Sequence, residues 1–294
     1  MAGNGKGQQG AFAAARPEAG DLVDRFLENK LREALFGGQD VVTLGRLRIE
    51  GTLGQGAMGA ILSAFDPVLD RHVAIKSLRP GQGQESQQLL REARMLAKLD
   101  HANVVSIFDV LEEEGGLYLV MEQIRGGDLR AWMDEVRPWQ EVVELFESIG
   151  RGLAAAHALG IAHCDVKPEN VVVSEGRPRL IDFGLAHQQS DGPSHGGTKA
   201  YLAPERIAGQ EGSAGADQYA FFVALVEAIE GQRPSVDTQQ QWEKMPGWLE
   251  DVARRGLHED PERRFPNMDA AVAALRPTRA QSKLKIAAAV VVLA

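Results

Sequence analysis

Residues 163–170 read His-Cys-Asp-Val-Lys-Pro-Glu-Asn, and this short polar stretch is the strongest indication of the fold. It brings a carboxylate at Asp165, an ammonium group at Lys167 and an amide at Asn170 into one loop. A second carboxylate, Asp182, follows in an Asp-Phe-Gly tripeptide. Carboxylate and amide oxygens are the hard ligands that Mg²⁺ prefers. Each tripeptide alone arises by chance, and its meaning depends on the motifs around it.

A glycine-rich run lies upstream at residues 53–61, which read Leu-Gly-Gln-Gly-Ala-Met-Gly-Ala-Ile. The same glycine pattern marks dinucleotide-binding turns, where the glycines lead from a strand into a helix. Here a run typical of a strand follows the glycines, so a hairpin lying over phosphates fits better. The candidate nucleotide-binding residues in this run are Leu53, Gly54, Gly56, Gly59 and Ile61.

The next strand, Val73-Ala74-Ile75-Lys76, ends on a lysine about 20 residues after the glycines. This strand resembles the third-strand motif of protein kinases, which implies that the ammonium group of Lys76 contacts the α- and β-phosphates of a nucleotide. An acidic partner would hold it there. We assign that partner as Glu92, on a helix predicted over residues 86–99. Glu85 is a poorer choice, because it lies at the start of the helix and away from its apolar side.

In this order and spacing, the motifs resemble those of eukaryotic-like protein kinases, in particular the bacterial receptor-type serine/threonine kinases. The resemblance covers roughly residues 44–275. It implies that ATP and Mg²⁺ are cofactors and that Asn170 and Asp182 are the metal ligands. It further implies that Asp165 accepts the proton of the acceptor hydroxyl and that Lys167 steadies the γ-phosphate. It also implies that Glu122 and Ile124 bind adenine through their backbone, with Ile61 and Ala74 on the two faces of the ring.

The resemblance continues downstream of Asp182. An Ala-Pro-Glu tripeptide ends at Glu205, and the family pairs this glutamate with an arginine that corresponds to Arg264. Asp217 corresponds to an aspartate that bonds the backbone of the catalytic loop. Thr198 corresponds to a threonine typical of the serine/threonine kinases. These residues imply protein substrates with serine or threonine acceptors.

The sequence departs from the family at Cys164, where the family has an arginine. That arginine pairs with a phosphorylated residue of the activation segment, which here runs from Gly184 to Glu205, and couples phosphorylation to activity. A cysteine cannot form a charge-assisted pair with phosphate. We therefore predict that activity does not depend on phosphorylation of Ser190 or Ser194 in this segment.

The pattern of apolar residues predicts an α+β fold with two lobes, β-rich at first and mainly helical afterwards. The family resemblance implies that this is a bilobal protein-kinase-like fold, with a β-rich N-lobe and a mainly helical C-lobe. Residues 1–20 read as a disordered segment and 21–38 as an amphipathic helix. The N-lobe is expected over 39–122 and the C-lobe over 123–277. The helix at 21–38 is expected to dock on the N-lobe through one apolar stripe, and the alternative is pairing with a second copy in a homodimer.

Residues 278–294 combine a basic segment with an apolar end. The run Ile286 to Ala294 is apolar and follows Arg279, Lys283 and Lys285. It is too short to span a bilayer, so it is either a terminal helix or the start of a membrane helix with its basic flank on the cytoplasmic side. With its single cysteine, the chain is expected in the cytoplasm, in the second case tethered to the inner face of the plasma membrane.

The formal net charge of −9 disfavours nucleic acid as a partner. The functional prediction is a serine/threonine protein kinase that transfers the γ-phosphoryl group of ATP to proteins. The alternative is a pseudokinase that serves as a nucleotide-binding or scaffold module. The presence of Lys76, Glu92, Asp165, Asn170 and Asp182 favours the enzyme. The Ala-Pro-Glu segment disfavours a kinase of small molecules.

Overall fold

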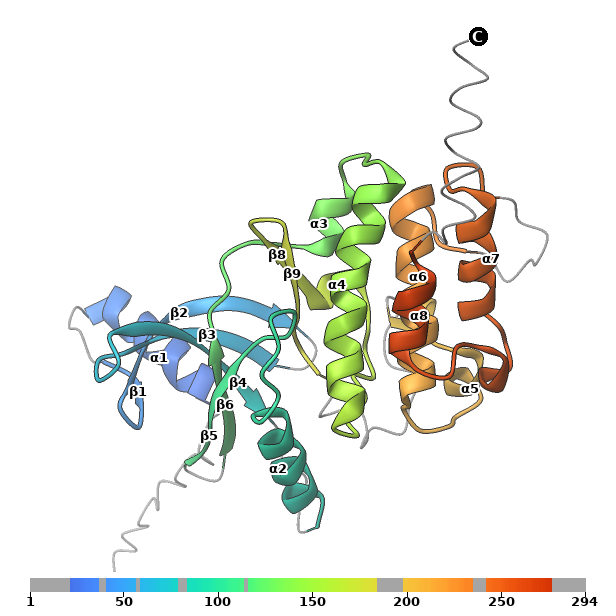
Figure 1. The fold of residues 1–294 in the computed structure, drawn as a ribbon. Helices are drawn as coiled ribbons and strands as arrows, with labels where there is room; N and C mark the ends of the chain where they lie inside the picture. The colour runs from blue at the N-terminus through green and yellow to red at the C-terminus, as the bar shows by residue number, and fades with distance from the viewer. Residues whose placement is uncertain are drawn as a thin grey trace, which may run out of the picture.

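The computed structural model describes residues 22–36, 41–56, 59–78, 84–113, 116–183, 198–234 and 242–276. Within these ranges a β-rich N-lobe lies beside a mainly helical C-lobe (Figure 1). The predicted α+β class and bilobal fold are confirmed. The segments 1–20 and 278–294 and the serines Ser190 and Ser194 lie outside the described residues. No helix in the described ranges has the length and apolarity that crossing a bilayer requires.

The N-lobe is built on a six-stranded antiparallel sheet with the strand order β1-β2-β3-β4-β6-β5. Its strands are β1 (Thr43–Leu44), β2 (Leu47–Gly56), β3 (Gly59–Asp66), β4 (Arg71–Leu78), β5 (Ile107–Glu113) and β6 (Gly116–Glu122). β2 and β3 form a hairpin that pairs Gly56 with Gly59. The predicted strand after the glycines is confirmed as β3, which excludes the strand-to-helix turn of a dinucleotide-binding fold.

Helix α1 (Leu22–Phe36) packs against this sheet through its first turns. Leu22 and Phe26 are buried in a core cluster with residues of β1 to β4 and β6. The expectation of a single docking stripe is wrong for Leu27, Leu31 and Leu35, which are 47%, 61% and 65% exposed. At 3.6 residues per turn, these leucines form a neighbouring ridge, rotated away from the one that Leu22 and Phe26 share.

The C-lobe packs its helices around α4 (Trp139–Ala158) and α6 (Ala214–Glu230). α6 is buried on nearly all sides; Ser213 caps its start and Gly231, in the left-handed conformation, ends it. The other helices are α2 (Gln84–Leu96) in the N-lobe and α3 (Leu129–Met133), α5 (Pro204–Ile207), α7 (Gly247–Gly256) and α8 (Met268–Ala274) in the C-lobe. Single 3₁₀ turns occur at Pro168–Asn170, Thr198–Tyr201 and Pro261–Arg263.

A small three-stranded sheet, with the strand order β7-β8-β9, lies at the junction of the two lobes (Figure 1). Its strands are β7 (Gly127–Asp128), β8 (Val171–Ser174) and β9 (Arg177–Leu180). Leu180 accepts a hydrogen bond from Val105 N and donates one to Asn103 O, both at 2.9 Å. In Figure 1 the β8–β9 hairpin lies between the N-lobe sheet and α4. The loop before β8 and the residues after β9 therefore meet at the junction of the lobes.

Candidate active site

The loop between α4 and β8 brings Asp165, Lys167 and Asn170 together. Lys167 Nζ donates to Asp165 Oδ2 at 2.7 Å. Asn170 Nδ2 donates to the same oxygen and to the Asp165 carbonyl oxygen, both at 2.8 Å. Because both partners of Nδ2 are acceptors, the orientation of the amide is fixed and Asn170 Oδ1 remains to bind another group. Two residues singled out in the sequence, Lys167 and Asn170, thus converge on the buried carboxylate of a third, Asp165.

Asp217, at the start of α6, holds the backbone of this loop. Its carboxylate accepts hydrogen bonds from His163 N at 2.6 Å and from Cys164 N at 2.8 Å. The bond that the family resemblance implied is therefore confirmed. His157 of α4, which the sequence reasoning missed, adds a contact from Nε2 at 2.8 Å. The Asp217 side chain is 2% exposed, so these bonds form where water competes little.

His163 connects the loop to the residues that precede Asp182. Its ring is buried, and burial lowers its pKa, so the imidazole is neutral. Nδ1 accepts a bond from Asp165 N at 3.3 Å, which leaves Nε2 to donate to Ile181 O at 2.9 Å. The ring also packs against Phe183, with 4.5 Å between the ring centroids. The neutral ring thus couples the two segments that carry Asp165 and Asp182.

Lys76 pairs with Asp182, not with Glu92. Its Nζ lies 3.1 Å from Asp182 Oδ1, and the two side chains are 10% and 22% exposed. Glu92 Oε1 instead accepts a hydrogen bond from Gln88 Nε2, one turn earlier on α2, at 3.0 Å. The expected Lys76–Glu92 ion pair is therefore not formed in this structure, because α2 and β4 do not bring the two groups together. The catalytic role assigned to Glu92 stays a prediction.

The donor atoms near Asp182 suit a magnesium ion. Asn170 Oδ1 and the Asp182 carboxylate are hard oxygen ligands, and Mg²⁺ commonly completes its coordination with phosphate oxygens and water. Ile181 N donates to Asn170 O at 2.9 Å, which brings the two ligand-bearing segments together. Across the described ranges, no group of three or more His, Cys, Asp or Glu side chains could hold a metal ion alone. The two predicted ligands thus fit a metal ion shared with a nucleotide.

The predicted adenine contacts gather in one apolar cluster. Ala74 and Met121 are buried there, and Ile61 and Ile124 pack against them. Lys76 lies opposite Ile61 in the β3–β4 register, so the lysine and the apolar cluster share one side of the hairpin. Leu53 and Gly54 of β2 are exposed, and Gly56 and Gly59 pair at the end of the β2–β3 hairpin. The Glu122 side chain binds Arg179, a residue that the sequence reasoning did not identify.

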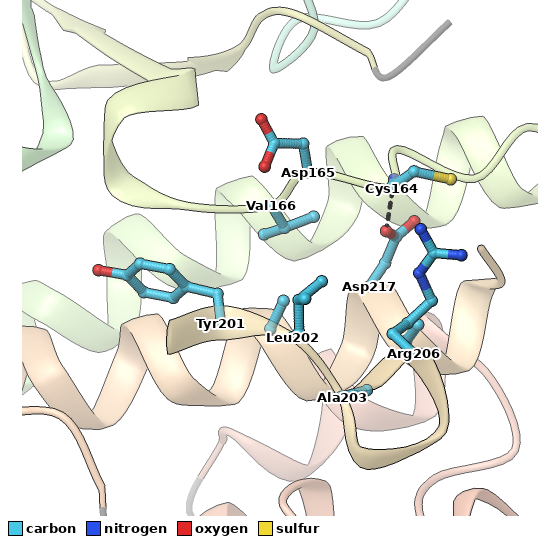
Figure 2. A pocket seen from close by; sticks show the side chains of 10 residues that line it. Cys164, Asp165, Val166, Tyr201, Leu202, Ala203, Arg206 and Asp217 are labelled. Atoms are coloured by element: carbon cyan, nitrogen blue, oxygen red, sulfur yellow. Dashed lines mark hydrogen bonds between the residues drawn. The ribbon is translucent and has the colours of Figure 1, made fainter. Parts of the chain in front are cut away.

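The Cys164 side chain points away from the Asp165 carboxylate (Figure 2). Figure 2 shows its sulfur and the Asp165 carboxylate directed to opposite sides of the loop. A small cavity of about 20 Å³ lies beneath, lined among others by Cys164, Arg206 and Asp217. Burial raises the pKa of the thiol to about 12, so it remains protonated at neutral pH. A Cβ atom built on Gly212 would lie 2.3 Å from the sulfur, so the glycine leaves the space that the side chain fills.

Glu205 and Arg264 form the structural pair that the resemblance implied. Arg264 Nη1 and Nη2 donate to the two Glu205 oxygens at 2.7 and 2.8 Å. Both side chains are buried, and Arg264 Nε also donates to His258 O at 2.8 Å. This bidentate geometry is the strong form of an arginine–carboxylate pair. It fixes the end of the activation segment to the turn before α8.

A second, partly buried cluster beside the catalytic loop was not identified by the sequence reasoning. Arg130 of α3 donates from Nε to Glu169 and from Nη1 to Glu227, both at 3.0 Å. Tyr201 donates to Glu227 Oε2 at 2.5 Å and also contacts Arg130. Burial and the Glu227 carboxylate raise the pKa of Tyr201, so the phenol stays protonated. Its members are scattered along the chain, and no spacing in the sequence marks them.

Comparison with known proteins identifies relatives over most of this chain. The family described as "Protein kinase domain" matches residues 47–272. Serine/threonine-protein kinase PksC of Streptomyces coelicolor is 30% identical over 264 residues, 77% of this chain and 48% of PksC. PrkC of Bacillus subtilis is 34% identical over 65% of this chain and 31% of its own length. PknA of Mycobacterium tuberculosis is 33% identical over 66% and 49%.

The structural comparison agrees. A crystal structure of a point mutant of the Mycobacterium tuberculosis PknI kinase domain matches with a TM-score of 0.66 and 28% identity, over 81% of this chain and 97% of that one. This chain spans about half or less of each of the three relatives named above. The match therefore concerns their kinase portion, and the motifs, the bilobal fold and the convergence on Asp165 all agree with it. The chain belongs to the protein kinase domain family.

Proposed function

We propose that this chain is an ATP- and Mg²⁺-dependent kinase that phosphorylates serine or threonine hydroxyls of proteins. The observation that carries the proposal is the convergence of Lys167 and Asn170 on the buried Asp165 carboxylate. In the reaction the hydroxyl oxygen bonds to the γ-phosphorus of ATP, and the bond between that phosphorus and the bridging oxygen of ADP breaks. The hydroxyl proton passes to Asp165.

Each residue has a positioning or electrostatic task in this proposal. Asp165 orients the hydroxyl, and Lys167, 2.7 Å from it, places positive charge where the transferred group carries negative charge. Mg²⁺ held by Asn170 and Asp182 would neutralise phosphate charge. Lys76 must leave Asp182 to reach the phosphates, and Glu92 is then its proposed partner. Ile61, Ala74 and Ile124 would enclose the adenine, whose edge faces the Glu122–Ile124 backbone.

The proposal is tested by incubating the protein with ATP·Mg²⁺ and a generic acceptor protein such as casein, followed by mass spectrometry. Wild type should transfer phosphate to serine or threonine, and Asp165→Asn should lose the activity while keeping its circular dichroism spectrum. Asp251→Asn, an exposed carboxylate on α7, is the matched control and should remain active. An inactive wild type that still binds nucleotide would be the pseudokinase.

We also propose that activity is independent of activation-segment phosphorylation. The support is Cys164: its side chain is neutral and directed away from Asp165, and Asp217 holds the loop backbone without help from a charged side chain at position 164. The variant Ser190→Ala/Ser194→Ala should keep its rate within about twofold of wild type. A large loss would overturn the proposal.

The cellular setting is a further proposal, drawn from the sequence. We propose cytoplasmic action with tethering to the inner face of the plasma membrane through residues 278–294, and a homodimer through the exposed ridge of Leu27, Leu31 and Leu35. Membrane fractionation of the protein with and without residues 278–294 tests the tether. Sedimentation of wild type and Leu31→Glu tests the dimer, and an unchanged mass would reject that interface.

A further inference from the structure

We propose that Arg179 is a positioning residue, which presets the angle between the lobes by binding Glu122 and thereby favours nucleotide binding. This inference rests on the proposed ATP-dependent function. Glu122 is the last residue of β6 in the N-lobe sheet, and Arg179 lies in β9 of the small C-lobe sheet. Arg179 Nη1 donates to Glu122 Oε1, so the ion pair joins the two sheets directly.

Residues 122–124 link the two lobes and are called the hinge below. Gln123, which follows Glu122 in the hinge, is bound to the other lobe, the N-lobe. Ser63 Oγ of β3 donates to Gln123 Oε1 at 3.2 Å. Adjacent hinge residues are thus held by side chains from different lobes, Glu122 by the C-lobe and Gln123 by the N-lobe. A rotation of one lobe against the other would stretch at least one of these contacts. The hinge is therefore restrained by side chains as well as by its backbone.

The strand that carries Arg179 also leads to the reacting end of the site. Leu180, the next residue, is bonded through its backbone to Asn103 and Val105, and Ile181 N is bonded to Asn170 O. Asp182 follows directly. Through the Glu122 side chain, Arg179 therefore connects the hinge, whose backbone would bind adenine, with the strand that precedes Asp182, where phosphates and metal would bind.

This connection has a thermodynamic consequence for a ligand that touches both ends. ATP must contact the hinge and Asp182 at once, so its affinity depends on their separation being set in advance. Without the pair, the lobes sample more arrangements, and binding must select among them. The side chains of Arg179 and Glu122 are 28% and 30% exposed, so solvent weakens the pair only in part. Loss of Arg179 should then weaken nucleotide binding about threefold to tenfold.

The test is calorimetric titration of the full chain with ADP and Mg²⁺, which needs no catalytic activity. Arg179→Ala should raise the dissociation constant about threefold to tenfold, and Arg179→Lys, which keeps the charge, should restore most of the affinity. Arg177→Ala removes an exposed arginine from the same strand and is the matched control, with affinity equal to wild type. In a double-mutant cycle, Glu122→Gln should add little to Arg179→Ala.

Kinetics separates positioning from a general structural role. KM for ATP should rise in parallel with the dissociation constant, with kcat changed less than about twofold and the melting temperature without nucleotide nearly unchanged. Equal affinity of wild type and Arg179→Ala, tighter binding by the variant, or additive effects in the cycle would each overturn the inference. A wild type that binds ADP·Mg²⁺ but transfers no phosphate would reject the proposed activity and leave the affinity comparison valid; a wild type that binds no ADP·Mg²⁺ would overturn both proposals.

Discussion

Lys76 Nζ lies 3.1 Å from Asp182 Oδ1, so the residue expected to bind phosphates and a residue expected to bind the metal neutralise each other. Glu92 is left to a neighbour on its own helix, Gln88. In the proposed reaction both Lys76 and Asp182 would face the nucleotide. The contribution of Glu92 to the stability of the free protein can thus be measured separately from its proposed contribution to the reaction rate.

The first prediction concerns Glu92→Gln. Without nucleotide, this change should alter the free energy of unfolding by less than about 0.5 kcal/mol, because Glu92 does not pair with Lys76. Its phosphotransfer rate should fall about tenfold or more, because Lys76 would lack a partner when it contacts phosphates. Urea unfolding and a kinase assay measure the two effects, with Glu144→Gln on the exposed face of α4 as control. A loss of about 2 kcal/mol or more would show that Glu92 is already paired in the free protein.

The second prediction concerns the Glu205–Arg264 pair. Glu205→Ala leaves a buried guanidinium without its carboxylate and should cost about 3–5 kcal/mol, a fall in melting temperature of roughly 10 °C. Arg276→Ala removes a 66% exposed arginine from its pair with Glu147 and should cost less than about 1 kcal/mol. Thermal unfolding compares them, and similar losses for both would contradict the special weight given to the buried pair.

Acid should weaken the same pair. Burial alone would raise the pKa of Glu205, but hydrogen bonding to Arg264 and the backbone and the positive charges of Arg264 and Arg206 together outweigh it, and the pKa lies below the ordinary value of 4.5. A carboxyl group with a lowered pKa in the folded state contributes stability above its unfolded pKa. That contribution is complete at neutral pH and is lost as the pH falls below about 4.5.

The third prediction concerns close packing at Gly256. A Cβ atom there would lie 1.9 Å from a ring carbon of Phe222 in the buried helix α6. Gly256→Ala should therefore destabilise the protein by about 1–3 kcal/mol, through displacement of the ring or of α7. Gly247, at the start of the same helix, has no atom within 4 Å of such a Cβ, so Gly247→Ala should be neutral or slightly stabilising. Equal effects in urea unfolding would refute the packing argument.

The fourth prediction concerns pH and His163. Burial lowers the pKa of this histidine below its ordinary value of 6.5, so on acidification the unfolded chain takes up a proton before the folded one does. Stability should therefore decrease as the pH falls below 6.5, by up to about 1.4 kcal/mol per pH unit from this group. His163→Gln should lower the stability at pH 7.5 but flatten the dependence between pH 6.5 and 5. A variant with the wild-type slope would contradict the assignment.

The sequence predicted those features that depend on residue order and local pattern. The glycine hairpin, the catalytic loop, the Asp217 anchor and the Glu205–Arg264 pair could be placed because each residue belongs to a motif with a fixed position in a known family. The burial of Leu22 and Phe26 followed from helical periodicity. The convergence of Lys167 and Asn170 on Asp165 needed only a loop of fixed length.

What the sequence missed depends on how separate elements lie relative to one another. Glu92 has the right position on α2, yet the placement of α2 against β4 decides whether Lys76 can reach it, and no local pattern encodes that placement. Arg179 and Glu122 are 57 residues apart. From sequence alone, an arginine on a short strand is usually interpreted as an exposed surface residue, so their ion pair was not predicted. Likewise, the spacing of Arg130, Glu169 and Glu227 in the sequence does not predict that α3, the 3₁₀ turn at 168–170 and α6 bring these residues together.

Asp217 has a consequence that extends beyond the geometry of the loop. Its carboxylate fixes the loop through the backbone N–H groups of His163 and Cys164, so the anchor does not depend on which side chain follows the histidine. We therefore expect that an exchange of the side chain at position 164 would leave Asp165 in place. In engineering terms, the proposed phosphorylation control and the proposed catalytic machinery could be changed separately.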